Sequence, residues 1–218
     1  MPANYNNSAW FYDQLSRLVY GRTLIKAQAY LLQYVPENAI ILIVGGGTGE
    51  ILEELTKKHP TGLQITYVEI AKNMMIRSKK RNTGNNRVIF INNAVENVSL
   101  TGGFDVIVTP FLFDNFKEPA AKRIFKHVHQ LLKPSGTWLY TDFQLTGKWW
   151  QSVLLKSMQL FFKLICGVES STLPNMNKLF QNDEYGLIEE KTFFGEFVVS
   201  KNYQKPAPVR HCEERSNL

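Results

Sequence analysis

The residues best suited to bind a ligand are Gly45–Gly49, in which only Thr48 is not a glycine. They follow the apolar, β-branched run Ala39–Val44 and precede Glu50–Lys58, which has a helical pattern. Glycine lets the backbone turn sharply and lets a ligand approach the main chain. The start of a helix adds unpaired N–H groups and a positive dipole end. This order of segments predicts a ligand-binding loop. A plain tight turn is the alternative, but it would not require four glycines.

The spacing of the glycines separates the ligand classes that use such loops. A phosphate-binding loop needs a lysine after its last glycine, where this chain has Glu50 and Ile51. A dinucleotide-binding loop follows G-x-G-x-x-G, and Glu50 stands where its third glycine should be. The spacing present is G-x-G-x-G, at Gly45, Gly47 and Gly49. We therefore expect a ligand without phosphate groups.

A second candidate binding residue is Glu69, near the end of the expected strand Gln64–Ile70. A carboxylate at this point can accept hydrogen bonds from the 2′ and 3′ hydroxyls of a ribose. Alone, Glu69 could equally be a solvent-facing residue that ends a strand. Together with the glycine loop, it predicts a crevice at the carboxyl ends of the first two strands.

Strand and helix patterns alternate through the middle of the chain. The expected strands are Ala39–Val44, Gln64–Ile70, Arg87–Asn92, Phe104–Val108 and Thr137–Phe143, and the expected helices are Glu50–Lys58, Lys72–Arg81 and Pro119–Leu132. Such alternation indicates an α/β fold with a doubly wound sheet and helices on both faces. Leu187–Phe194 and Glu196–Tyr203, joined across Gly195, predict a C-terminal hairpin. The sequence thus predicts a Rossmann-like, seven-stranded, mostly parallel sheet with an antiparallel C-terminal hairpin.

Several of these segments resemble the class I methyltransferases that use S-adenosylmethionine. The resembling residues are Ile41–Gly49, Tyr67–Ile70, Asn92–Ala94, Phe104–Pro110 and the turn Leu131–Gly136, and the terminal hairpin fits the last strands of that family. The resemblance covers roughly Asn38–Tyr203. Phe11–Asp13 and Val19–Gly21 also look like the helical lid of members that act on quinones and lipids.

The resemblance implies a domain organisation as well. It gives an N-terminal helical lid at residues 1–36, a core at residues 37–204 with a helical insertion at about 148–183, and a flexible tail at residues 205–218. We expect the lid and the amphipathic helix Trp149–Val168 to cover the crevice together.

The resemblance also assigns roles to individual residues. The cofactor-binding set would be Gly45, Gly46, Gly47, Thr48, Gly49, Glu69, Ile70, Asn93, Ala94 and Thr109, with Tyr12 and Tyr20 from the lid. Glu69 would hold the ribose, Ile70 and Asn93 would face the adenine, and Thr109 would lie beside the sulfonium. Two positions depart from the family. Ile43 replaces an acidic residue that helps to position the cofactor's amino group, and Asn93 replaces the common aspartate.

The stretch Thr109–Asp114 should face the methyl group, because it follows the fourth strand. It lacks the Pro-Pro pair typical of enzymes that methylate adenine or glutamine nitrogen. Phe111 and Phe113 instead predict an apolar wall for the substrate. Asp114 is the candidate catalytic base or substrate anchor, or else it caps the next turn, and Asp142 is a second candidate.

Composition and charge narrow the possible partners. Two cysteines and four histidines show no metal-ligand spacing, so we expect no metal. The net charge is +6, but the basic residues of 70–95 fit the solvated face of a helix, which makes nucleic acid an unlikely partner. Lys156 and Lys163 interrupt the most apolar stretch, which argues against a membrane span. With no targeting segment in Met1–Gln14, we expect a cytoplasmic protein. The oligomeric state is left open.

These observations predict S-adenosylmethionine-dependent methyl transfer, with S-adenosylhomocysteine as product, to a small apolar or aromatic molecule. Two alternatives stay open. One is a nucleic-acid or protein methyltransferase, suggested by the positive charge. The other is a protein that binds the cofactor without catalysis, suggested by Ile43. The sequence does not identify whether oxygen, nitrogen or carbon would be methylated.

Overall fold

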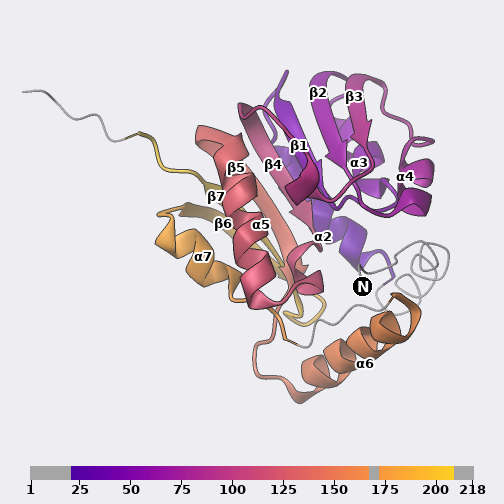
Figure 1. Cartoon of the computed structure of the whole chain (residues 1–218), viewed down its shortest axis with the longest axis vertical. Coiled ribbons are helices and arrows are strands. Elements are labelled where there is room, and N and C mark those ends of the chain that lie inside the picture. Colours follow the sequence, from indigo (N-terminus) through magenta and orange to yellow (C-terminus); the bar gives the residue numbers. More distant parts are fainter. Residues whose placement is uncertain (1–20, 167–171, 209–218) are drawn as a thin grey trace, which may run out of the picture.

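A computed structural model describes residues 21–166 and 172–208, without the side chains of 161–166. Its centre is one seven-stranded sheet with the strand order β3-β2-β1-β4-β5-β7-β6 (Figure 1). The strands are β1 Ile40–Val44, β2 Thr61–Val68, β3 Asn85–Ile91, β4 Phe104–Pro110, β5 Leu132–Phe143, β6 Gly186–Phe193 and β7 Val198–Gln204. The first five pair in parallel, and β7 lies antiparallel to both β5 and β6. The predicted fold class is confirmed.

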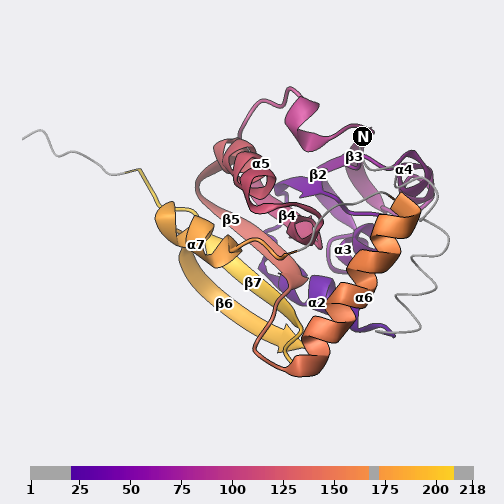
Figure 2. The same ribbon diagram turned by 60° about the horizontal axis from the view of Figure 1, so that its bottom comes forward.

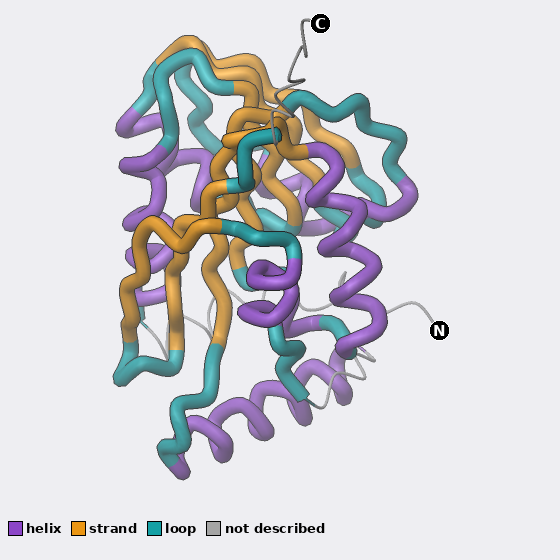
Figure 3. The backbone as a smooth tube through the Cα atoms, turned by 90° about the vertical axis from the view of Figure 1, so that its left-hand side faces the viewer, coloured by secondary structure: helices purple, strands orange, loops and turns teal. Residues whose placement is uncertain are grey.

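Helices cover both faces of the sheet (Figure 3). They are α2 Thr23–Leu31, α3 Glu50–Lys58, α4 Lys72–Ser78, α5 Glu118–Leu131, α6 Trp149–Cys166 and α7 Met176–Asn182, with single 3-10 turns η2 Leu32–Tyr34, η3 Val95–Asn97 and η4 Phe113–Asn115. In β1, Leu42 and Val44 pack on the face that carries α5 and α7, and Ile41 and Ile43 pack on the face that carries α3. A strand buried on both faces requires such a continuous apolar sequence.

The observed elements differ from the expected ones at several bounds, including the following three. The strand β2 ends at Val68, so Glu69 lies just beyond it. The strand β5 begins at Leu132, directly after α5, because the expected turn around Ser135 is a bulge within the strand. The helix α7 begins inside the stretch expected to be irregular, where Asn175 caps it by accepting a hydrogen bond from Lys178 N at 3.1 Å.

The C-terminal hairpin forms as expected, but its turn is longer than the single Gly195. It contains Phe194, Gly195 and Glu196, all with positive φ. In β7, Ser200 Oγ donates a hydrogen bond to Ala27 O of α2 at 2.8 Å. Helix α2 is therefore attached to the second-last strand of the sheet order, although the two are far apart in sequence.

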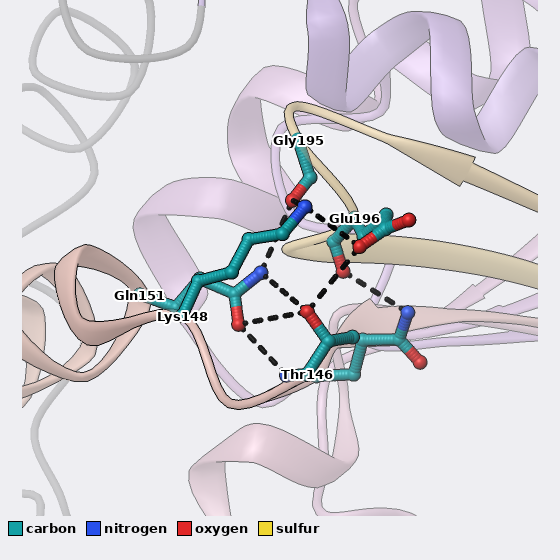
Figure 4. A network of polar contacts seen from close by, with 6 residues as sticks. Thr146, Lys148, Gln151, Gly195 and Glu196 are labelled. Carbon is teal, nitrogen blue, oxygen red and sulfur yellow. Dashed lines mark hydrogen bonds and ion pairs between the residues drawn. The ribbon is translucent and has the colours of Figure 1, made fainter.

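Helix α6 lies along one end of the sheet, directly after β5 (Figures 1 and 2). Its start is tied to the hairpin turn by a polar network (Figure 4). Gln151 Nε2 donates to Gly195 O at 3.1 Å, and Gln151 Oε1 accepts from Thr146 N at 2.7 Å. Lys148 pairs with Glu196 at 2.7 Å, which lowers the pKa of that carboxyl group.

The side of α6 that faces the protein packs in an apolar cluster with α2 and with the ends of β4, β5 and β7. The cluster includes Leu24, Ala27, Phe111, Phe143, Trp150, Leu155 and Phe197. Trp149, Val153 and Leu160 lie on its exposed side. No helix within the described ranges is long and apolar enough to span a membrane.

Lys205, placed by the sequence in the flexible tail, is anchored to the end of α5. Its Nζ donates to His129 O at 2.7 Å and to Leu132 O at 2.8 Å. A lysine at this position satisfies carbonyl groups that the last helical turn leaves unpaired. Residues 1–20, which contain most of the expected lid, and residues 209–218 lie outside the described part.

Candidate functional site

The glycine loop leaves β1 through a left-handed backbone. Gly45, Gly47 and Gly49 have φ values of 72°, 61° and 82°, a region that side-chain-bearing residues rarely adopt. Gly45 N donates to Val68 O at 2.9 Å, which fixes the start of the loop against β2. Gly49 is the N-cap of α3. The loop therefore brings the N-terminus of α3 to the carboxyl ends of β1 and β2.

Gly46 is required by its neighbours rather than by its φ. A Cβ atom built there would lie 2.5 Å from Cε2 and from Oη of Tyr67. The ring of Tyr67 thus lies directly under the loop, with no room for a side chain between them. On the opposite flank, a Cβ at Gly45 would lie 2.9 Å from Leu112 Cδ1, so the loop after β4 also touches the glycine loop.

Glu69 lies against the same loop and is only 5% exposed. Its Oε2 accepts from Gly47 N at 2.9 Å, and its Oε1 accepts from Ala71 N at 2.8 Å. Burial raises the pKa of Glu69, while these backbone donors act in the opposite direction. An ionised carboxylate has about four acceptor positions, so each oxygen retains capacity for one hydroxyl donor. Such a carboxylate could accept from the two free hydroxyls of a ribose.

The residues expected to face an adenine lie at the ends of β2 and β3. The side chain of Ile70 is 49% exposed, which leaves an apolar surface beside Glu69. Asn93 Oδ1 accepts from Ala94 N at 2.9 Å, so the N–H that the resemblance assigns to the adenine ring is paired within the chain. Asn92 Nδ2 donates to Glu69 O at 2.7 Å and to Ile70 O at 3.0 Å, which holds the two strand ends together.

The loop after β4 divides its aromatic residues between core and surface. Thr109 is fully buried, and its hydroxyl accepts from Trp138 Nε1 at 2.9 Å. Because the whole residue is buried, neither its side chain nor its backbone presents a surface to a cofactor in this structure. Phe113 is also fully buried in the core, so its side chain is not part of an exposed substrate wall. Phe111 is partly exposed, has a φ of 49°, and packs on Phe143 with ring centroids 5.0 Å apart.

The buried Asp142 and the partly exposed Asp114 form an acidic pair between this loop and the end of β5. Asp142 Oδ2 accepts from Phe113 N at 3.0 Å, and its Oδ1 accepts from Phe143 N at 2.8 Å. Asp114 Oδ1 accepts from Asn115 Nδ2 at 2.7 Å. Burial raises the pKa of Asp142 to about 7. Burial and then the charge of Asp142 raise the pKa of Asp114 well above its ordinary value. Both shifts disfavour the ionised form, and Asp142 fixes the loop that carries Asp114.

Two residues that support the site were not assigned to it from the sequence. Arg81, expected on a solvated basic face, donates from Nε to Thr48 O at 2.9 Å and pairs with Glu53 at 3.3 Å. Tyr67 donates from its hydroxyl to Gly47 O at 3.0 Å. An arginine after a helix is common on a protein surface, and a tyrosine in a strand is common in a core. The sequence therefore does not indicate these contacts, which depend on how β1, β2 and α4 lie relative to one another.

The remaining expected site residues, Tyr12 and Tyr20, lie outside the described residues. Among residues 21–166 and 172–208, no group of three histidine, cysteine, aspartate or glutamate side chains is arranged to hold a metal ion.

The chain is similar to known methyltransferases over part of its length. Residues 41–136 match the model of a family described as "Methyltransferase domain". The chain is 27% identical over 143 residues to malonyl-acyl-carrier protein O-methyltransferase of Priestia megaterium, which covers 66% of this chain and 51% of that protein. It is 27% identical over 113 residues to phosphoethanolamine N-methyltransferase of Plasmodium falciparum, covering 51% and 42% respectively. The chain thus spans about half the length of these curated relatives, or less.

Solved structures show the same fold. Magnesium protoporphyrin IX methyltransferase from Synechocystis, with bound S-adenosylhomocysteine, aligns with a TM-score of 0.67 at 14% identity, covering 92% of this chain and 96% of that one. 1,6-Didemethyltoxoflavin-N1-methyltransferase from Burkholderia thailandensis aligns with a TM-score of 0.61 at 14% identity, covering 91% and 88%.

Residues 41–136 thus match a methyltransferase domain, and the fold of the described residues is the one seen in these solved methyltransferases. The matched segment contains the glycine loop, Glu69, Asn93 and Asp114, and it ends before Asp142 and the hairpin. The comparisons do not define the quinone and lipid subtype, because the relatives named above act on different kinds of acceptor.

Proposed function

We propose that this chain transfers a methyl group from S-adenosylmethionine to a small apolar or aromatic molecule. The observation that carries the proposal is the glycine loop closed against Glu69, whose Oε2 accepts from Gly47 N at 2.9 Å. This arrangement presents main-chain groups and a buried carboxylate at the carboxyl ends of β1 and β2. The loop has no lysine that could bind a phosphate group. It suits a cofactor that has a free ribose and an amino acid moiety.

Methyl transfer requires little from the protein beyond the orientation of cofactor and acceptor. When bound, S-adenosylmethionine supplies a methyl group on a sulfonium, which is already an activated leaving group. The chain would hold the ribose through Glu69 and the adenine against Ile70. The acceptor would then need an in-line approach and a site that excludes water.

The acceptor side is proposed from the loop after β4 and the end of β5. Phe111 and Phe143 offer an aromatic surface there, and α6 packs against both. Asp114 is the candidate to accept a proton if the acceptor must lose one, and its raised pKa makes its carboxylate a stronger base. These features support an apolar or aromatic acceptor over a nucleic acid. Arg81, from the basic stretch, is also committed to Thr48 and Glu53.

Titration calorimetry tests the cofactor assignment. We expect S-adenosylmethionine and S-adenosylhomocysteine to bind at one site and NAD not to bind. Micromolar binding of NAD with no response to S-adenosylhomocysteine would contradict the proposal. Cofactor binding without turnover on a panel of hydroxyl, amine and activated-carbon acceptors would favour a non-catalytic binding protein.

A further inference from the structure

Tyr67 occupies an unusual place for a tyrosine in a central strand. It is fully buried in β2, and its register partner in the neighbouring strand β1 is Ile43. Its ring packs on Phe90 with the centroids 5.5 Å apart and lies under Gly46. Its hydroxyl donates to Gly47 O at 3.0 Å. The side chain therefore runs from the core of the sheet to the underside of the glycine loop.

Gly47 is held at both of its peptide bonds. Its N–H donates to Glu69, and its carbonyl oxygen accepts from Tyr67. These two groups belong to successive peptide planes, so the two contacts together restrict the φ and ψ of Gly47. The residue has a φ of 61°, and a glycine there has many other conformations open to it. Both contacts come from alternate residues of the β2 end, whose side chains point to the same face.

The strand β1 supplies no polar side chain that could do the same. Ile43 and Val44, the last two residues before the loop, are apolar and buried. Without the Tyr67 hydroxyl, the carbonyl of the partly buried Gly47 would lose this hydrogen bond, and the loss is unfavourable unless another donor replaces it. The loop would then be free to rotate this peptide toward another donor.

We propose that Tyr67 is a positioning residue that presets the glycine loop in the conformation that binds the cofactor. The inference rests on the proposed function, because the loop is there the cofactor site. Burial, and then the charge of Glu69, raise the pKa of Tyr67 well above its ordinary value. The phenol therefore stays protonated and able to donate throughout the pH range in which Glu69 titrates.

The test compares two phenylalanine variants in titrations with S-adenosylhomocysteine. Tyr67→Phe keeps the ring under Gly46 and removes only the hydroxyl. We expect its dissociation constant to rise about three- to tenfold, the range for loss of one neutral hydrogen bond. Tyr203→Phe is the matched control. Tyr203 is also buried, and its hydroxyl donates to Asn177 Oδ1 at 3.2 Å, away from the loop. Its loss should lower the melting temperature without changing the dissociation constant.

A double-mutant cycle separates positioning from general stability. Because Tyr67 and Glu69 restrain the same glycine, Tyr67→Phe should weaken binding less in a Glu69→Gln background than in the wild type. If Tyr67→Phe does not fold, Tyr67→Met replaces the phenol by a flexible apolar side chain without a hydroxyl. The same change in dissociation constant is then expected.

Each failure has its own signature. If the wild type binds S-adenosylhomocysteine and Tyr67→Phe binds it equally well, the inference is wrong and the proposed function stands. Equal weakening in Tyr203→Phe would also overturn it, because the effect would then be a general loss of stability. If the wild type itself does not bind, the proposed function is wrong.

Discussion

Glu69 must be ionised to accept two hydroxyl donors, and its burial works against ionisation. Burial raises the pKa of Glu69, and the backbone N–H groups of Gly47 and Ala71 offset part of this effect. A ribose hydroxyl pair would add donors to the charged form and lower this pKa again. The affinity for the cofactor should therefore fall as the pH drops through the raised pKa of Glu69.

Replacing Glu69 tests its role directly. Glu69→Ala should weaken binding of S-adenosylhomocysteine roughly tenfold or more, since hydrogen bonds to a charged group contribute about 1.5–3 kcal/mol. Glu54→Ala is the control, because Glu54 pairs with Lys57 on the surface of α3. Calorimetry on both variants, with circular dichroism to verify the fold, measures the difference. An unchanged dissociation constant in folded Glu69→Ala would make Glu69 a strand terminus only.

Asp142 gives the stability of the protein a pH dependence of defined sign. The pKa of its carboxyl group rises from 3.8 in the unfolded chain to about 7 in the folded one. Between these values the folded chain binds a proton that the unfolded chain does not, so its contribution to the free energy of unfolding decreases as the pH rises. The neighbouring titratable groups, Asp114 and Tyr140, face the same carboxyl group and also have raised pKa values.

We expect Asp142→Asn to reduce the loss of stability between about pH 5 and pH 8, a window that follows from this linkage. Urea unfolding at both pH values, for variant and wild type, measures the change in slope. Asp105→Asn is the control, because the pairing of Asp105 with Lys133 and its bond from Ile40 N lower its pKa and place its effect below this window. Parallel slopes for wild type and Asp142→Asn would contradict the assignment.

At the scale of elements, the hairpin turn and α6 behave as one unit. Gly195 supplies the carbonyl that both Gln151 of α6 and Lys148, just before α6, bind (Figure 4). The backbone of Gly195 also lies against Trp150 of α6. A Cβ at Gly195 would lie 2.9 Å from Trp150 Cζ2. The turn therefore determines how the first turn of α6 sits on the sheet.

The comparison of two glycines isolates this contact. Gly195 has a φ of 58° and Gly147 a φ of 87°, but a Cβ at Gly147 would meet no atom within 4 Å. Both alanine variants should suffer backbone strain of about 1–2 kcal/mol. Gly195→Ala should lose about 1 kcal/mol more, because it also overpacks against Trp150. Chemical denaturation measures both, and equal losses would show that Trp150 moves aside freely.

The elements that the sequence predicts best are those whose pattern depends only on residues close together in the chain. The apolar run of β1 and the glycines after it predict a buried strand and its loop, and α3 has the expected bounds. Helix α7 was missed because it has only seven residues, too few to establish a period beside the irregular stretch before it. The contacts of Tyr67 and Arg81 could not be predicted, since they depend on which residues of separate elements become neighbours.

The same limit applies to the acceptor side of the site. Phe111 and Phe113 are two positions apart in sequence, and both were expected in one wall. The left-handed backbone at Phe111 directs the two side chains differently, so Phe113 enters the core. A positive φ at a phenylalanine is not predictable from its residue type.

At the scale of the whole molecule, the segment that matches the methyltransferase domain forms one half of the sheet, from the edge strand β3 to the start of β5. Helix α2 precedes it, and α6, α7, β6 and β7 follow it. The parts that contact Phe111 and Phe143 come largely from these flanking elements. Selection of the acceptor is therefore expected to depend on them, whereas cofactor binding depends on the matched segment. The lid expected at residues 1–36 stays a prediction, because most of it lies outside the described residues.

The hydrogen bond between Ser200 and Ala27 joins residues 173 positions apart. On the ribosome, α2 emerges early and β7 emerges only after nearly all the intervening chain has been made. Until then the apolar face of α2 lacks its partner strand, and β5 has an open edge. The sheet can therefore be completed only after synthesis has passed the hairpin. Folding of the nascent chain should be late and all at once, rather than gradual from its N-terminal end.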